Sequence, residues 1–138
     1  GRTALAKSEF EAAVEHDPNS KFGWYNLGVI AQNAKDVSRA TTAYENAITI
    51  DPHFESALYN YGLLLFSEHD LDQSINYLDR AVQENDKDAS AHWNLGLALA
   101  QRNKSGDNNR SKAELNRGLQ LNPSLAGAVA LTPTTAAR

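Results

Sequence analysis

The sequence predicts an all-α fold in which antiparallel helix pairs stack into an elongated array. Three observations predict it: a short motif that recurs at a fixed step, small residues that keep the same step, and helix-breaking residues between the segments. The motif Trp24-Tyr25-Asn26-Leu27-Gly28 returns from Leu58 and again from His92, each time after 34 residues. A period of that length is typical of proteins whose repeats bury their apolar faces against their neighbours.

Further positions recur at the same step and add small, large apolar and breaker residues to the pattern. They are Ala6, Ala40 and Ser74; Phe10, Tyr44 and Leu78; Ala13, Ala47 and Ala81; and Pro18 and Pro52. With the motif, they resemble the tetratricopeptide (TPR) family, whose W-x2-L-G-x2-Y, A-x3-F and P positions they match. The resemblance extends from residue 1 to about residue 123. It implies a right-handed superhelical array of antiparallel helix pairs, a TPR solenoid.

Residues 1–20 are expected to form the second helix of a truncated repeat. Leu5, Phe10 and Val14 have helical spacing, and Asp17-Pro18 ends the segment because proline cannot continue a helix. Its first helix is missing, so its apolar stripe should be incompletely covered and favour self-association, as could the C-terminal end. The chain has no Met and begins inside a predicted helix, so we expect it to be a piece of a larger protein.

Two complete repeats follow, at 21–54 and 55–88. The first should contain helices near 21–34 and 37–50, and Asp51-Pro52 should end it. The second should contain helices near 55–68 and 71–84. Asp86 stands where the family has proline, which weakens the stop signal without removing it, since aspartate is a poor helix former.

Residues 89–123 read as a third repeat with a three-residue insertion in its intra-repeat turn, because Gly118 and Pro123 fit only if that turn is lengthened. The polar run Asn103–Asn109 is expected to be a protruding loop, with the next helix beginning at Arg110. In residues 124–138, a short capping helix should precede a disordered tail.

The two faces of each first helix are predicted to have different roles. One face should pack on the second helix of its repeat, and Gly28, Gly62 and Gly96 should let the two backbones approach closely. The other face lines the concave surface in tetratricopeptide arrays. Residues 22–34, 56–67 and 89–101, which supply that surface, contain no Asp, Glu, Lys or Arg.

This uncharged face carries three parallel rows of residues: an aromatic row, an asparagine row and an aliphatic row. We therefore predict a peptide-binding groove. Its candidate residues are Tyr25, Tyr59 and Trp93; Asn26, Asn60 and Asn94; and Val29, Leu63 and Leu97, together with Asn33.

The asparagine row is the feature that points to peptide backbone as the ligand. Neighbouring helices lie about 10 Å apart, whereas an extended peptide advances about 3.3 Å per residue, so one asparagine meets roughly every third peptide residue. An amide can pair with both the N–H and the C=O of a peptide unit. The row is similar to the asparagine ladder of O-GlcNAc-transferase-type superhelices. The alternative is that these asparagines only solvate an otherwise apolar surface.

The sequence thus favours a non-enzymatic protein–protein interaction module that binds an extended, weakly charged peptide. The rival is a structural module that assembles through its terminal helices, Leu5 and Phe10 being the candidate contacts. A carboxylate clamp for chaperone C-termini is disfavoured, since Tyr25, Ser90 and Asn94 occupy its cationic positions.

Composition argues against other classes of function. A net charge of -4 and the lack of a Lys/Arg cluster disfavour nucleic-acid partners, and no apolar run is long enough for membrane insertion. With no Cys and four scattered His, we expect no metal or other cofactor. His92 replaces a large apolar residue of the motif, so it should be a packing residue rather than a catalytic one.

Overall fold

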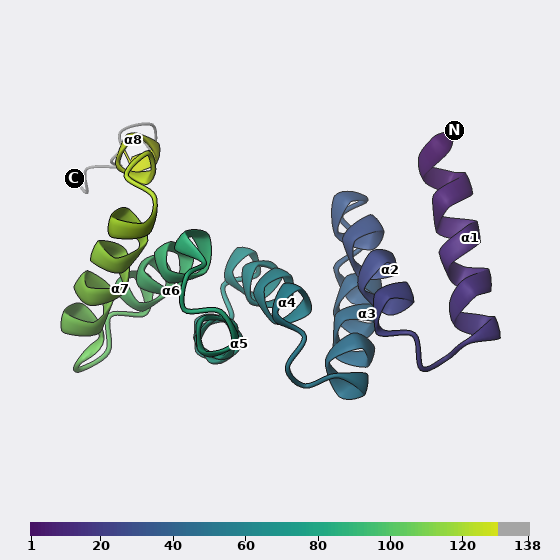
Figure 1. Cartoon of the computed structure of the whole chain (residues 1–138), viewed down its shortest axis with the longest axis horizontal. Helices are drawn as coiled ribbons and strands as arrows, with labels where there is room; N and C mark the ends of the chain where they lie inside the picture. Colours follow the sequence, from purple (N-terminus) through teal and green to yellow (C-terminus); the bar gives the residue numbers. More distant parts are fainter. Residues whose placement is uncertain (130–138) are drawn as a thin grey trace.

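The computed structural model describes residues 1–129, which form helices joined by short turns and no strands (Figure 1). This confirms the predicted all-α fold. The helices are α1 (Arg2–His16), α2 (Lys21–Asn33), α3 (Val37–Ile50), α4 (Glu55–Ser67), α5 (Leu71–Glu84), α6 (Ala89–Arg102), α7 (Asp107–Leu121) and α8 (Leu125–Val129).

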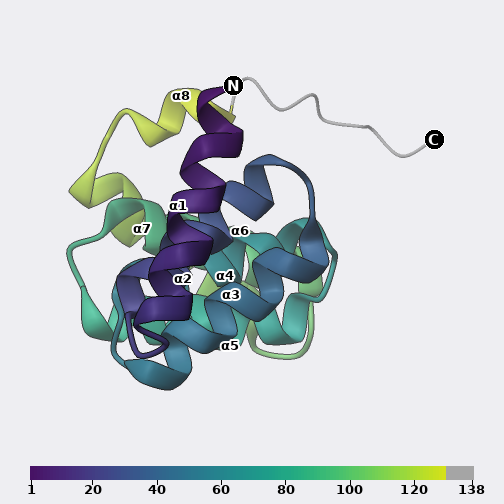
Figure 2. The ribbon, with the colours of Figure 1, turned by 90° about the vertical axis from the view of Figure 1, so that its right-hand side faces the viewer.

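The helices follow one another along the array in chain order. The pairs α2/α3, α4/α5 and α6/α7 pack most extensively, and α3 contacts α4 as α5 contacts α6. Helix α1 lies at one end of the array and packs chiefly on α2, whereas α8 lies at the other end against α7 (Figures 1 and 2). The chain is therefore an elongated helical solenoid, and its core extends along the array instead of surrounding one centre.

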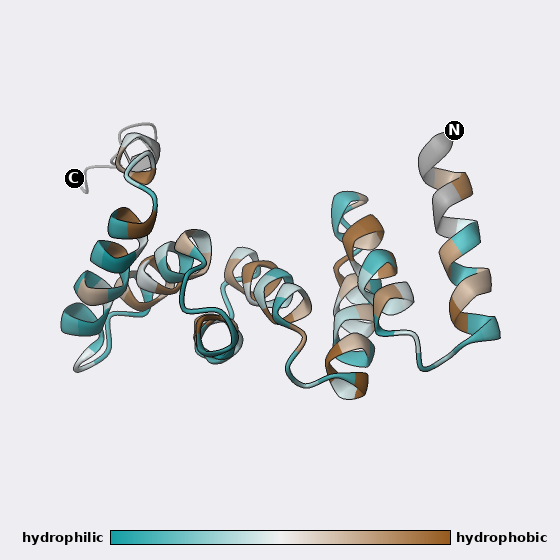
Figure 3. Cartoon of the chain, viewed as in Figure 1, coloured by the Kyte–Doolittle hydropathy of each residue, from teal (hydrophilic) through white to brown (hydrophobic). Residues whose placement is uncertain are grey.

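The core consists of two clusters of buried residues. Tyr44 and Leu58 are fully buried in the first cluster, which joins α2, α3 and α4. Leu78, Leu95 and Leu99 are fully buried in the second, which joins α5 and α6. Hydrophobic residues accordingly lie on the sides of the helices that meet, and polar residues cover the outer sides of α5 and α7 (Figure 3).

The glycines of the motif sit where the two helices of a pair come closest. A Cβ added at Gly62 would lie 2.7 Å from Leu78 Cγ. One added at Gly96 would lie 2.7 Å from Leu115 Cγ and 3.0 Å from its backbone nitrogen. Helix pairs at this separation leave no room for a side chain, which explains why glycine recurs at this position.

The turns inside the first two repeats are alike. Lys35 and His69, which are 34 residues apart, have positive φ angles of 58° and 62° and end the first helix of each pair. Asp36 and Asp70 then cap the second helix by accepting a hydrogen bond from the backbone N–H three residues ahead. Each turn thus spans three residues between its helices, from Ala34 to Asp36 and from Glu68 to Asp70.

The turn of the third repeat differs from the expectation. Asn103 again has a positive φ, of 52°, but the loop ends at Gly106, and α7 begins at Asp107 rather than at Arg110. The prediction that the whole run to Asn109 is loop was therefore wrong. Its last part supplies the first turn of a helix, and the carboxylate of Asp107 accepts hydrogen bonds from Arg102 Nε (2.8 Å) and Lys104 N (2.9 Å).

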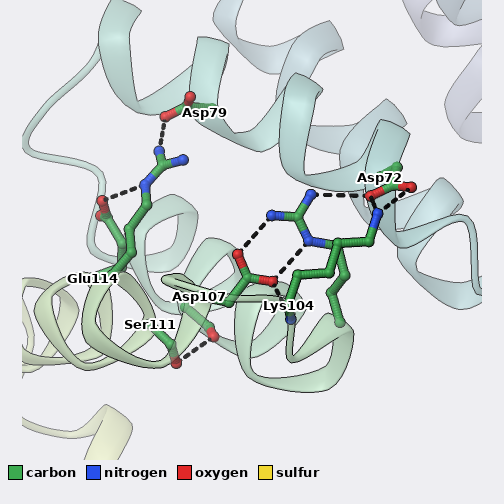
Figure 4. Close-up of polar contacts among 9 residues, drawn as sticks. Asp72, Asp79, Lys104, Asp107, Ser111 and Glu114 are labelled. Atoms are coloured by element: carbon green, nitrogen blue, oxygen red, sulfur yellow. Dashed lines mark hydrogen bonds and ion pairs between the residues drawn. The ribbon is translucent and has the colours of Figure 1, made fainter.

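After this turn the repeat returns to the common packing. Ser111 Oγ donates to Gly96 O, as Ser74 Oγ donates to Gly62 O, both at 2.8 Å (Figure 4 shows the Ser111 contact). Ser74 and Ser111 are therefore equivalent positions, 37 residues apart instead of 34. The loop absorbs the extra residues, and the helix pair packs as its neighbours do.

Two further sequence predictions concern the C-terminal end and membranes. Helix α8 is a single short helix after Pro123. The disordered tail was predicted for residues that lie outside the described part of the chain. Within residues 1–129, no helix is both long and apolar enough to cross a membrane.

Candidate functional site

The candidate site is the exposed side of α2, α4 and α6, here called the A-helix face. Helix α4 lies between the other two and contacts both. The predicted site residues are mostly half-buried on this face, with Asn33 more exposed and Trp93 nearly covered at 8% exposure. The half-buried residues are Tyr25, Asn26, Val29, Tyr59, Asn60, Leu63, Asn94 and Leu97.

Hydrogen bonds join the aromatic row to the asparagine row, from one repeat to the next. Asn60 Nδ2 donates to the hydroxyl oxygen of Tyr25 at 3.0 Å. Asn94 Nδ2 donates to that of Tyr59 at 3.1 Å. Asn60 and Asn94 thus each pair with the tyrosine 35 residues earlier. We call this diagonal set of amide and hydroxyl groups the Tyr–Asn ladder.

The ladder leaves part of its hydrogen-bonding capacity unused, and the unused part differs along the face. Asn94 Nδ2 also donates to Ser90 O at 2.9 Å, so its two N–H groups are both engaged. Asn60 engages one in the ladder. Asn26 makes no side-chain hydrogen bond within residues 1–129. An asparagine amide carries two N–H donors and a carbonyl acceptor. Asn26 therefore offers a ligand the most hydrogen-bonding groups, whereas Asn94 offers chiefly its carbonyl oxygen.

Sequence reasoning missed an aromatic cluster at the α2 end of the face. Phe22 is 61% exposed, and its ring meets Phe54 edge-on with centroids 5.3 Å apart. Phe54 in turn lies 5.3 Å from the ring of Tyr25. Phe22 could have been found, since it precedes Asn26 by one helical turn. Phe54 could not be placed from helical spacing because it lies outside the helix, at the N-cap of α4.

Charged groups lie at the edge of the face. Lys21 pairs with Asp51 and also stands over the rings of Phe22 and Phe54, at 5.2 and 5.0 Å from their centroids. On α4, burial and the neighbouring Asp88 carboxylate raise the pKa of Glu55 above its usual value. The middle of the face, along the Tyr–Asn ladder, is uncharged.

The Tyr59 hydroxyl of the ladder is held in its neutral form. Burial, followed by the negative charge of Asp88, raises the pKa of Tyr59. A neutral hydroxyl that accepts a hydrogen bond from an asparagine still has its own proton to donate. The face can therefore offer both donors and acceptors without offering charge.

His92 is placed as a packing residue. It is 8% exposed, and its ring nitrogens contact Glu114 Oε2 at 2.7 Å and Asp86 O at 3.0 Å. Both contacts connect it to neighbouring structural elements and neither opens onto the A-helix face. Across residues 1–129, no three His, Asp or Glu side chains gather closely enough to hold a metal ion.

Comparison with known proteins adds sequence and fold evidence. Two family models described as tetratricopeptide repeat match residues 31–101 and residues 1–55. A crystal structure of MamA superimposes with a TM-score of 0.80 at 20% identity, over 92% of this chain and 72% of that one. A MamA RS-1 ArsTM double mutant gives 0.78 at 20% identity, over 91% and 68%. Curated protein sequences give no significant match.

Proposed function

Because the chain belongs to the tetratricopeptide repeat family, whose models match more than half of it, we propose that it binds an extended, weakly charged peptide segment along its A-helix face. Members of this family generally mediate protein–protein interaction or scaffolding, and the chain is an interaction module of this kind. The observation that carries the finer proposal is the Tyr–Asn ladder. It repeats amide and hydroxyl groups at the spacing of the helices on a face whose middle is uncharged.

The ladder gives register, and the aromatic groups give affinity. A neutral hydrogen bond contributes about 0.5–1.5 kcal/mol, so a few bonds from Asn26, Asn60 and Asn94 orient a peptide without binding it tightly. The exposed ring of Phe22, beside Phe54 and Tyr25, offers apolar area at one end of the face. Burying such a ring contributes roughly 1.5–3 kcal/mol.

The test is a random peptide library selected against the protein, followed by titration of a selected peptide by calorimetry. Asn26→Ala is the most informative single change, because Asn26 makes no side-chain hydrogen bond within residues 1–129. The triple variant Asn26→Ala/Asn60→Ala/Asn94→Ala should weaken binding by roughly 10- to 100-fold. Higher salt should change the affinity little, since the middle of the face has no charge to screen.

A matched control exists on the second helices of the pairs. Asn46, Asn76 and Asn116 lie on α3, α5 and α7 and make no side-chain hydrogen bond within the described residues. Their triple replacement by Ala should leave the affinity unchanged. If the A-helix-face variant and this control bound the peptide equally well, the asparagines of the face would only solvate it. A steep loss of affinity with salt would place the binding site on the charged helices instead.

One observation favours a second function, self-assembly through α1. Leu5 is 63% exposed and Ala13 is exposed, whereas Ala47 and Ala81, the counterparts of Ala13, are fully buried. Light scattering after gel filtration tests this. Leu5→Ser should disrupt a concentration-dependent oligomer. Phe22→Ser should not, although it removes an apolar side chain that is about as exposed as Leu5 but lies on the A-helix face. A monomer at every concentration would refute assembly.

A further inference from the structure

The side chain of Tyr44, in the core, forms a hydrogen bond with a residue of the A-helix face. Tyr44 of α3 is fully buried, and its ring lies against Gly28, where an added Cβ would be 2.6 Å from Tyr44 Cε1. Its hydroxyl donates to Gln32 Oε1 of α2 at 2.6 Å. Gln32 follows Val29 by three residues, so the two side chains share a face of the helix. A hydroxyl of the core thus supports an amide of the face.

This hydrogen bond sets the direction of the Gln32 amide. Because Oε1 accepts the proton of Tyr44, Nε2 at the other end of the amide is turned away from that hydroxyl. Gln32 is half-buried, and its Nε2 donates no hydrogen bond within residues 1–129. The amide therefore offers donors to a ligand, while its oxygen is already engaged.

Asn60 of α4 presents the opposite group. Its Nδ2 donates to the Tyr25 hydroxyl at 3.0 Å, and its side chain also lies beside the Tyr44 hydroxyl. Its oxygen Oδ1 accepts no hydrogen bond in the described part of the chain. Gln32 and Asn60 both border Tyr44, so a free donor and a free acceptor lie near each other between α2 and α4. We call Gln32, Tyr44 and Asn60 the α2–α4 amide site.

This site occurs at one step of the array. Phe66 and Leu78 stand at the places of Gln32 and Tyr44 in the second repeat, each 34 residues later. In the third repeat the residues at these places are Ala100 and Leu115. Their apolar side chains offer neither a donor nor an acceptor. A ligand group that requires both is therefore fixed to one place along the face.

A primary carboxamide is the side-chain group that matches the α2–α4 amide site. Its C=O accepts from Gln32 Nε2 while its NH2 donates to Asn60 Oδ1. A carboxylate has no proton for Asn60, and an ammonium group has no acceptor for Gln32. An alcohol offers both functions from one oxygen, whereas a carboxamide offers them from two atoms, as two separate partners require. An aliphatic side chain would leave both groups unpaired, which is unfavourable.

The depth of the site favours a side chain of the ligand over its main chain. Tyr44 is 0% exposed, so the Gln32 oxygen bonded to it lies at the floor of the A-helix face. In the proposed function, the main chain of the peptide follows the Tyr–Asn ladder. Side chains of the peptide then reach the floor between the contacts of its main chain.

We propose that the α2–α4 amide site selects an asparagine or glutamine side chain at one position of the bound peptide. Gln32 and Asn60 contact this side chain, and Tyr44 is a positioning residue that holds the Gln32 amide in place. This inference rests on the proposed peptide binding and adds a sequence requirement to it. The selected residue is neutral, which agrees with a weakly charged peptide.

The first test is the sequence of peptides selected from a random library on the whole protein. They should share an asparagine or glutamine at one position, and leucine or aspartate there should weaken binding about tenfold. Selected peptides that share no carboxamide but are weakened by Asn26→Ala would overturn this inference and leave the proposed function standing. A library that yields no binding peptide would overturn both.

Gln32→Glu separates recognition from packing, because a carboxylate still accepts from Tyr44 but donates nothing. It should weaken the asparagine peptide about tenfold more than the leucine peptide. Tyr44→Phe keeps the ring and should reduce the discrimination between the two peptides. Gln73→Glu makes the same charge change at an exposed position of α5 and should alter neither affinity. An equal loss for both peptides in Gln32→Glu, or full discrimination in Tyr44→Phe, would refute the assigned roles.

Discussion

The two junctions between complete repeats are built from different chemistry on the same backbone arrangement. Between the first and second repeats, a chain of rings runs from Tyr44 to Tyr61 and on to Tyr77, with centroids 6.2 and 4.6 Å apart. Between the second and third, Arg102 and Lys104 pair with Asp72 at 3.0 and 2.9 Å, and Arg110 pairs with Asp79 (Figure 4). We call these the aromatic and the ionic junction.

The difference shows that the helix spacing does not dictate how a junction is held. The glycines fix the approach of the two helices within each repeat. Across both junctions buried apolar residues pack together, and the groups around them add ring packing at one junction and ion pairs at the other. Ring packing responds weakly to salt and pH, whereas ion pairs respond to both. The two junctions should therefore fail under different conditions, and the following changes test this.

The largest expected effect is at the aromatic junction. Tyr61 is 5% exposed and packs between Tyr44 and Tyr77, so Tyr61→Ala should lower the free energy of unfolding by about 3–5 kcal/mol. Urea unfolding at low and high salt measures this loss, which should be the same at both. Tyr61→Phe removes only the hydrogen bond to Glu45 and should cost about 0.5–1.5 kcal/mol. An equal loss in both variants would mean that the hydroxyl, not the ring, holds the junction.

The next effect concerns Asp107, which pairs with Arg102 beside the ionic junction. The hydrogen bonds from Arg102 lower the pKa of Asp107 to about 2. A carboxyl in the unfolded chain has a pKa of about 4, so this group stabilises the fold fully above about pH 4. The contribution is lost as the pH falls through 4 to 2. Asp107→Asn should therefore lower Tm near neutral pH and flatten the acid part of its pH profile.

The control for Asp107 is Asp36→Asn in the first repeat. Asp36 caps α3 through its side-chain oxygen, and asparagine caps helices about equally well, so the Tm should stay almost unchanged. If Asp107→Asn gave the same acid profile as the wild type, the ion pair with Arg102 would make no contribution to stability.

The smallest effect is the coupling between Arg110 and Asp79. Both side chains are partly exposed, at 43% and 32%, and such pairs are worth about 0.2–1 kcal/mol. A double-mutant cycle with alanine should give this coupling at about 0.1 M salt and little at about 1 M, where the Debye length falls from about 10 to 3 Å. The same cycle on Tyr61 and Tyr77 should be insensitive to salt; a salt-dependent aromatic coupling would contradict the distinction between the junctions.

Much of the fold could be predicted because the repeat period compares each helix with its own copies. The glycine positions, the helix pairs and the turns at Lys35 and His69 follow from that comparison. The start of α7 could not be predicted in this way, since Asp107 stands in a polar, glycine-containing run whose composition is typical of a loop. What makes this run helical and ordered is its pairing with Arg102, together with the link from Arg102 to Asp72, 30 residues earlier.

For the candidate site residues, the sequence could predict their places on the helices but not the hydrogen bonds between them. Helical spacing places Tyr25, Asn26 and Asn60 on one side of their helices, and the structure has them there. The period does not reveal contacts between unlike positions of neighbouring repeats, so the bond from Asn60 to Tyr25 appeared only in the structure.

The chain-order packing described above also governs how the molecule loses its structure. Every extensive helix contact joins elements that are close along the chain, so cooperativity passes from each helix to the next and not through a shared centre. Helix α1, at one end of the array, has one main neighbour, so we expect it to separate from the array early in unfolding. Trp24 lies near that end and Trp93 is buried in the third repeat, so we expect the two tryptophans to report on different stages of a sequential transition.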